Sequence, residues 1–182
     1  MRSNFEQLKA IILSHSVSKK WSEARYEWSI VYCHDNGPCS DNWGICKCGY
    51  EGIRFEYTIE NDLNGCQLDP IGSTCIKQFG VKELKKEIAK FERKQKAIDK
   101  IDAIIYDTSA LPFSMTRDEF NKLFKAEHID ALHNKHIITD WEYTFLLDTR
   151  GKHVLTLKQS NKTKVIIDDI LNRLHTGVRV HV

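Results

Sequence analysis

Two short segments, Cys46-Lys47-Cys48-Gly49 and, after a strand and a turn, Gly72-Ser73-Thr74-Cys75, decide how this chain folds. Two cysteines one residue apart and followed by glycine predict a tight backbone turn, in which both sulfurs face one point and backbone N–H groups turn toward them. A third cysteine on a second glycine-containing turn suits a tetrahedral zinc site. We therefore predict zinc bound by Cys46, Cys48, Cys75 and a fourth ligand. The alternative is three reduced cysteines with a purely structural role.

The identity of the fourth ligand is left open by this pattern. Cys39 lies seven residues before Cys46, in a stretch with the composition of a loop, so the loop can bring it back to the metal. We expect Cys39 to be the fourth ligand, with Cys33 as the alternate. His34 and Cys66 are further substitutes. The alternative is that Cys39, Cys33 or both are free thiols.

The segment around these cysteines carries the pattern Cys46-x-Cys48-Gly49, Ile59-x-Asn61, Asn64-Gly65, Leu68 and Ile71-Gly72-Ser73-x-Cys75-Ile76-x-x-Phe79. This pattern resembles a zinc-knuckle family of small proteins from bacteriophages and mobile elements. Members of that family usually carry another cysteine just before the Ile-x-Asn segment, where this chain has Tyr57. The resemblance implies a phage-type protein that works around nucleic acid, and it names no reaction.

Composition is that of an ordinary water-soluble protein. The 182 residues are 41% hydrophobic and 29% charged, with a formal net charge of +2. No apolar run approaches the roughly 20 residues that span a bilayer, and no signal-peptide core follows the first residues. We therefore expect a cytoplasmic protein without a membrane partner, in the host cytoplasm if the chain is phage-encoded. In a reducing compartment, closely spaced cysteines indicate metal ligands rather than disulfides.

The pattern of apolar residues predicts an α+β fold. Ser3 and Glu6 have the spacing of a capping box at the start of a helix. Alternation predicts strands through Trp28, Ile30 and Tyr32 and, more clearly, through Ile53, Phe55, Tyr57 and Ile59. We expect a small antiparallel, β-rich, zinc-stapled lobe with an N-terminal helix over residues 1–80, packed against a helical region over residues 81–182. A few strands alone are marginally stable, and the metal would supply the missing stability.

The second half of the sequence predicts one long amphipathic helix followed by shorter ones. Its apolar residues follow three- and four-residue steps from Val81 to about Tyr106. Capping boxes at Thr116, Thr139 and Thr156 predict helices near 117–127, 140–148 and 157–174, and another short helix near 129–135. Gly177 is expected to end the last helix, and residues 178–182 alternate as a strand would.

Basic residues suggest where a partner binds. The long helix carries an excess of positive charge on the face opposite its apolar stripe. The segment around Cys46 and Cys48, which we call the knuckle, adds two basic residues and an exposed aromatic residue. Lys and Arg would engage phosphates, and the aromatic could stack on bases. A merely solvated helix face is the alternative. The predicted contacts are Lys85, Lys86, Lys90, Arg93 and Lys94 on the helix, and Lys47, Tyr50 and Arg54 at the knuckle.

These features predict a non-enzymatic zinc protein that binds nucleic acid, DNA more readily than RNA, or a protein bound to nucleic acid. One alternative, raised by the phage resemblance, is an anti-CRISPR inhibitor of a Cas9-type host nuclease. A second is a metal-dependent nuclease built on His128, His133 and His136, with partners such as Asp130 or Asp140. No nuclease signature, phosphate loop or nucleophile motif is present, so we expect no enzymatic activity.

Overall fold

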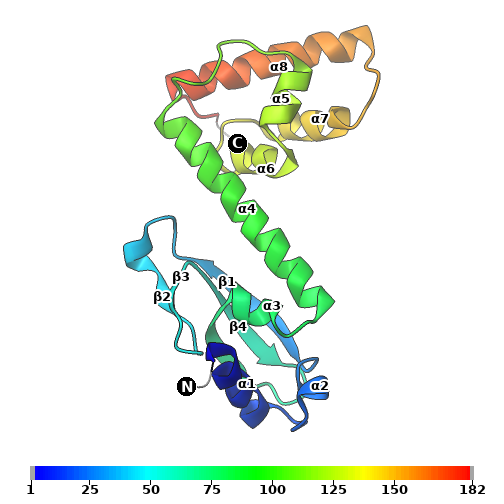
Figure 1. Ribbon diagram of the computed structural model, residues 1–182. Coiled ribbons are helices and arrows are strands. Elements are labelled where there is room, and N and C mark those ends of the chain that lie inside the picture. Colours follow the sequence, from blue (N-terminus) through cyan, green and yellow to red (C-terminus); the bar gives the residue numbers. More distant parts are fainter. Residues whose placement is uncertain (1–2, 181–182) are drawn as a thin grey trace. The chain divides into compact units, whose positions relative to one another are not determined.

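The computed structural model describes residues 3–180 and has an α+β fold (Figure 1). Two helices come first, a small antiparallel sheet follows them, and the remaining helices come after the sheet. This arrangement confirms the predicted fold class. The residues form two compact units, one extending to Glu92 and one beginning at Arg93. The sequence predicted a division between residues 80 and 81. The division lies later because the first turns of the long helix α4 (Lys82–Tyr106) bury Leu84 and Ile88 in the core of the N-terminal unit.

The N-terminal unit is built on a three-stranded antiparallel sheet with the strand order β1-β4-β5. These strands are β1 (Trp28–Asp35), β4 (Phe55–Asn61) and β5 (Gln67–Gly72). A second, two-stranded sheet pairs β2 (Gly44–Ile45) with β3 (Glu51–Ile53). The single strand predicted from residue 53 to residue 59 is therefore divided between the two sheets.

A bulge in β1 changes which residues face the core. The register between β1 and β4 shifts between Ile30 and Tyr32. An extra residue reverses the alternation of a strand, so Tyr32 is 61% exposed, although the sequence placed it on one face with Trp28 and Ile30. Cys33 packs against the core in its place.

Helices complete the N-terminal unit. The predicted first helix is α1 (Asn4–His15), and the Ser3 hydroxyl caps it by accepting a hydrogen bond from the Glu6 backbone N–H at 3.3 Å. The segment after α1 forms the short helix α2 (Trp21–Ala24). Helix α3 (Ser73–Lys77) is separate from α4, because Gly80 adopts a φ of +74° between them.

Over residues 93–180, the C-terminal unit contains the rest of α4 and four further helices. The capping boxes at Thr116, Thr139 and Thr156 all form both of their hydrogen bonds, as predicted. The first predicted helix is shorter than expected, because the chain leaves helical geometry at Phe124. The helices are α5 (Arg117–Leu123), α6 (Ala126–Asn134), α7 (Asp140–Arg150) and α8 (Leu157–Thr176).

The end of α8 agrees with its sequence, whereas the tail does not. Gly177 caps the helix in the left-handed region with a φ of +70°. Residues 178–180 are not in a strand, although the Val180 N–H donates to the His136 carbonyl at 2.7 Å. Residues 181–182 of the predicted strand lie outside the described residues.

A largely buried ion pair joins α7 to α8 inside the C-terminal unit. The Arg173 guanidinium donates to both carboxylate oxygens of Glu142, at 2.8 and 3.0 Å, and to the Ile137 carbonyl at 3.0 Å. Burial raises the pKa of Glu142, but hydrogen bonds from Arg173 and Thr139 outweigh this and hold the pKa below its usual range. None of the helices within residues 3–180 combines the length and the apolar character needed to cross a bilayer.

Candidate metal centre

The turn between β2 and β3 contains Cys46 and Cys48. The Cys46 N–H donates to the Tyr50 carbonyl at 2.8 Å, and the Gly49 N–H donates to the Cys46 carbonyl at 2.7 Å. Gly49 has a φ of +84°, a conformation that side chains other than glycine rarely adopt. The glycine after Cys48 therefore allows the chain to turn tightly enough to place both sulfurs on one side.

The third cysteine enters from the junction of β5 and α3. Helix α3 begins directly after Gly72, the last residue of β5, and Cys75 lies inside this short helix. The Gly72 N–H donates to the Cys46 sulfur at 3.3 Å. A Cβ on Gly72 would lie 3.0 Å from the Ile53 side chain, so glycine allows β5 to approach the turn this closely.

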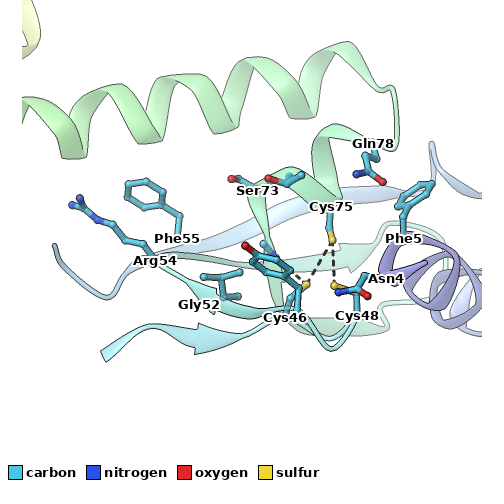
Figure 2. Close-up of a pocket in the computed structure, with 14 residues that line it drawn as sticks. Asn4, Phe5, Cys46, Cys48, Gly52, Arg54, Phe55, Ser73, Cys75 and Gln78 are labelled. Carbon is cyan, nitrogen blue, oxygen red and sulfur yellow. Dashed lines mark hydrogen bonds between the residues drawn. The ribbon is translucent and has the colours of Figure 1, made fainter. Parts of the chain in front are cut away.

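The structure brings together the three cysteines that the sequence singled out (Figure 2). The Cys75 sulfur lies 3.8 Å from that of Cys46 and 3.5 Å from that of Cys48, and all three sulfurs lie within 4.8 Å of one another. All three side chains are buried. Within residues 3–180, this cysteine cluster is the only group of histidine, cysteine or acidic side chains placed to hold a metal ion.

The electrostatics of the cysteine cluster favour a cation. Hydrogen bonding from Cys75 lowers the pKa of Cys46 to about 5 against the effect of burial, and the backbone N–H groups of Cys48 and Gly72 lower it further. The same contact with Cys46 raises the pKa of Cys75, and burial raises that of Cys48. Three thiolates cannot form together in this space without a neutralising charge, and a bound divalent metal supplies one.

The two cysteines predicted to supply the fourth ligand lie outside the cluster. Cys39 is exposed and precedes the short 3-10 helix η1 (Ser40–Asn42). Cys33 lies on β1 against the core, where burial raises its pKa. The prediction of Cys39, or alternatively Cys33, is therefore not met by the geometry. Cys66 is also separate, in the turn before β5.

Tyr57 is part of the hydrophobic core. It occupies the position at which members of the zinc-knuckle family usually have a cysteine. It is 1% exposed and packs edge-to-face on Phe91, with ring centroids 5.8 Å apart. Burial raises the pKa of its hydroxyl. Its side chain does not line the space around the cysteine cluster.

A cavity of about 410 Å³ opens beside the cysteine cluster (Figure 2). All three cysteines line it. Its other walls come from α1, β3, the start of β4, the end of β5, α3 and the connecting residues. Because these segments are far apart in the chain, no local sequence pattern predicts the cavity. Its aromatic lining is Phe5, Tyr50 and Phe55, and its polar lining includes Asn4, Arg54, Ser73, Thr74 and Gln78.

The residues predicted to contact a partner differ in whether they already form ion pairs within the chain. Arg54 donates to both carboxylate oxygens of Asp35 at 2.7 Å, and Arg93 pairs with Glu127 at 3.4 Å. Both arginines are therefore engaged within the chain. Lys47 and Tyr50 are exposed next to the cysteine cluster. The exposed helix lysines Lys85, Lys86, Lys90 and Lys94 have no ion pair with another described residue.

The histidines proposed for a nuclease site have local structural partners. The His128 ring accepts the Lys125 N–H at 2.9 Å at the start of α6. His133 hydrogen-bonds Asp140 at 2.7 Å and stacks on Tyr143. His136 is a connector residue with a φ of +56°. Within residues 3–180, these side chains do not form a group that could hold a metal.

Comparison of the chain with protein-family models, with curated proteins and with solved structures gives no significant match. The resemblance to phage zinc-knuckle proteins therefore stays a prediction, and the candidate site is defined by its geometry alone.

Proposed function

We propose that this chain is a non-enzymatic zinc protein that binds nucleic acid. Zinc at the cysteine cluster stabilises the N-terminal unit, and the exposed basic face of α4 contacts phosphates. The observation that carries the binding proposal is a row of exposed lysines, Lys82, Lys86 and Lys90, which we call the lysine row.

The distances between the sulfurs support zinc as the metal. A zinc ion bonded tetrahedrally to sulfur at about 2.3 Å places its ligand sulfurs about 3.8 Å apart. The Cys75 sulfur is 3.8 Å from that of Cys46 and 3.5 Å from that of Cys48. Soft thiolate ligands in a tetrahedral arrangement select zinc over hard cations such as magnesium, and backbone N–H groups directed at the sulfurs stabilise the thiolates.

The lysine row supports a polyanionic partner. Its members are four residues apart on one side of α4, opposite the buried Leu84 and Ile88. Like charges at this spacing cost a helix a few tenths of a kcal/mol for each pair, so the row does not serve the stability of α4. The neighbouring Glu83 and Glu87 form no ion pair with it among the described residues. The phosphates of a nucleic acid would neutralise this charge, and we expect DNA rather than RNA as the partner.

The test compares charge reversals at two places. We expect Lys86→Glu/Lys90→Glu to weaken binding to labelled duplex DNA, whereas Lys158→Glu/Lys164→Glu, the same charge change on exposed positions of α8, leaves it nearly unchanged. Log affinity falls against log salt with a slope of about −0.9 for each phosphate contact. Losing two contacts therefore flattens the slope by about 1.8.

Fluorescence anisotropy with duplex and single-stranded oligonucleotides, over a series of salt concentrations, measures both quantities. Equal affinities and equal slopes for wild type and Lys86→Glu/Lys90→Glu would remove the lysine row from the binding surface. A loss of the same size in the α8 variant would show that net charge, rather than this face, governs binding.

A further inference from the structure

We infer that the metal at the cysteine cluster keeps its fourth position open to a thiol from outside the chain, which reaches it through the adjoining cavity. The inference rests on the proposed zinc. It makes this centre a binding site as well as a structural one.

The ligand count leads to the open position. Zinc takes four ligands in structural sites, whereas three protein ligands leave one position for an external molecule. The cysteine cluster supplies three, and no further histidine, cysteine or carboxylate within residues 3–180 joins it. Cys33 is directed into the core, Cys39 is exposed beside η1, and neither lines the cavity.

The cavity gives an external molecule access to the metal. Its volume of about 410 Å³ suits a small ligand. Figure 2 shows the three sulfurs gathered on one side, with the side chains of Asn4, Phe5 and Gln78 nearby. Phe5 and Phe55 offer apolar contact for the body of a ligand, while Asn4 and Gln78 offer hydrogen bonds to a polar end.

The charge and softness of the centre select the ligand class. Three thiolates on a divalent zinc ion leave a net charge of −1, so a hard oxygen anion such as a carboxylate or a phosphate gains little by binding there. A water ligand on such a centre is weakly polarised, because the thiolates have already neutralised the metal. A thiol matches the softness of the existing donors. On binding, its sulfur replaces the water, its proton passes to solvent, and no electron is transferred.

Cobalt substitution tests this inference in the full chain without any activity assay. Tetrahedral cobalt bound to thiolates absorbs visible light, and its spectrum reports replacement of an oxygen ligand by sulfur. We expect benzyl mercaptan to change the spectrum saturably with one equivalent per metal. Benzyl alcohol, which has the same shape without the sulfur, should leave it unchanged. A cobalt centre that does not respond to the thiol would overturn the inference.

Two sets of variants identify the source of the fourth ligand and the route to it. We expect Cys33→Ser and Cys39→Ser to keep the wild-type cobalt spectrum and the response to thiol. A change in the thiol-free spectrum of either variant would assign the fourth ligand to the chain itself, or to a second copy of it, and overturn the inference. Asn4→Trp at the cavity should weaken thiol affinity on the order of tenfold, while the matched Ala10→Trp, exposed on α1 and outside the cavity, should not.

The same experiment separates the two proposals. Stoichiometric cobalt without any thiol response would overturn the open position and leave the metal centre in place. A folded protein that takes up neither cobalt nor zinc would overturn the metal centre, and the open position with it.

Discussion

The N-terminal and C-terminal units keep their folds by different means. In the N-terminal unit, a three-stranded sheet and short helices surround a core that includes Cys46, Cys48 and Cys75. In the C-terminal unit, capped helices surround an aliphatic and aromatic core that contains no cysteine, and Glu142 pairs with Arg173 beneath the surface. The N-terminal unit therefore depends on a cysteine cluster gathered from two separate turns. The C-terminal unit combines strong local capping signals with long-range ion pairs such as Glu142–Arg173 and Asp102–Lys135.

Metal removal should produce the largest difference in stability between the two units. Structural zinc contributes roughly 10–16 kcal/mol of apparent binding free energy at pH 7, comparable to or larger than the whole stability of a domain. We therefore expect Cys46→Ser, or treatment with a strong chelator, to unfold the N-terminal unit and leave helices α5 to α8 folded. Elemental analysis and residue-resolved hydrogen exchange measure the two effects.

Cys66→Ser is the control for metal removal, because Cys66 lies outside the cysteine cluster. It should retain one zinc per chain and the stability of wild type. Protein purified without chelator that contains no zinc, yet exchanges slowly in β4 and β5, would show that the N-terminal unit needs no metal.

The Glu142–Arg173 ion pair allows the complementary experiment, in which the C-terminal unit is destabilised and the N-terminal unit should be unaffected. Arg173→Met leaves the Glu142 carboxylate buried without its guanidinium partner, and breaking such a pair costs about 3–5 kcal/mol. Lys152→Met, which removes a partner of the exposed Asp148, should cost less than about 1 kcal/mol. Denaturant unfolding followed in the C-terminal unit measures both. Zinc content should stay at wild-type level in both variants, and loss of zinc in Arg173→Met would contradict the independence of the units.

Acid should weaken the C-terminal unit through the same carboxylate. The folded-state pKa of Glu142 lies below its ordinary value of 4.5. The stability that this difference contributes is fully present above the unfolded pKa, and it is lost as the pH falls through the folded pKa. Below pH 4.5, we therefore expect the unfolding free energy to fall less steeply in Glu142→Gln than in wild type. Parallel pH profiles for the two proteins would show that Glu142 does not govern acid unfolding.

Loss of a single helix cap is the smallest expected effect. Thr139 accepts the Glu142 N–H at 3.2 Å at the start of α7, and replacing such a cap by alanine costs about 1 kcal/mol. Thr144→Ala, at an exposed position inside the same helix, should change stability by about 0.5 kcal/mol or less. Thermal unfolding compares the pair. Equal stabilities would mean that tertiary packing, rather than the cap, determines where α7 begins.

The elements that the sequence predicted well depend on neighbours a few residues apart. Ser3, Thr116, Thr139 and Thr156 each lie three residues before the backbone N–H that they cap, so the spacing alone locates the helix starts. The end of α8 at Gly177 is equally local, because the left-handed conformation favours glycine. The grouping of the three cysteines also followed from two local turns, each shaped by its own glycine.

Tertiary structure decided what depends on distant partners. The bulge in β1 arises from pairing with β4, and it exchanged Tyr32 for Cys33 at the core. Arg54 was predicted to contact a partner, yet from its position between β3 and β4 it pairs with Asp35 at the end of β1. The cavity beside the cysteine cluster unites α1 with residues some seventy positions later. A sequence pattern reports neighbours along the chain, whereas these contacts exist only once the strands have paired and the core has closed. Folding also separates Cys33 and Cys39 from Cys46, Cys48 and Cys75, which proximity in the sequence does not reveal.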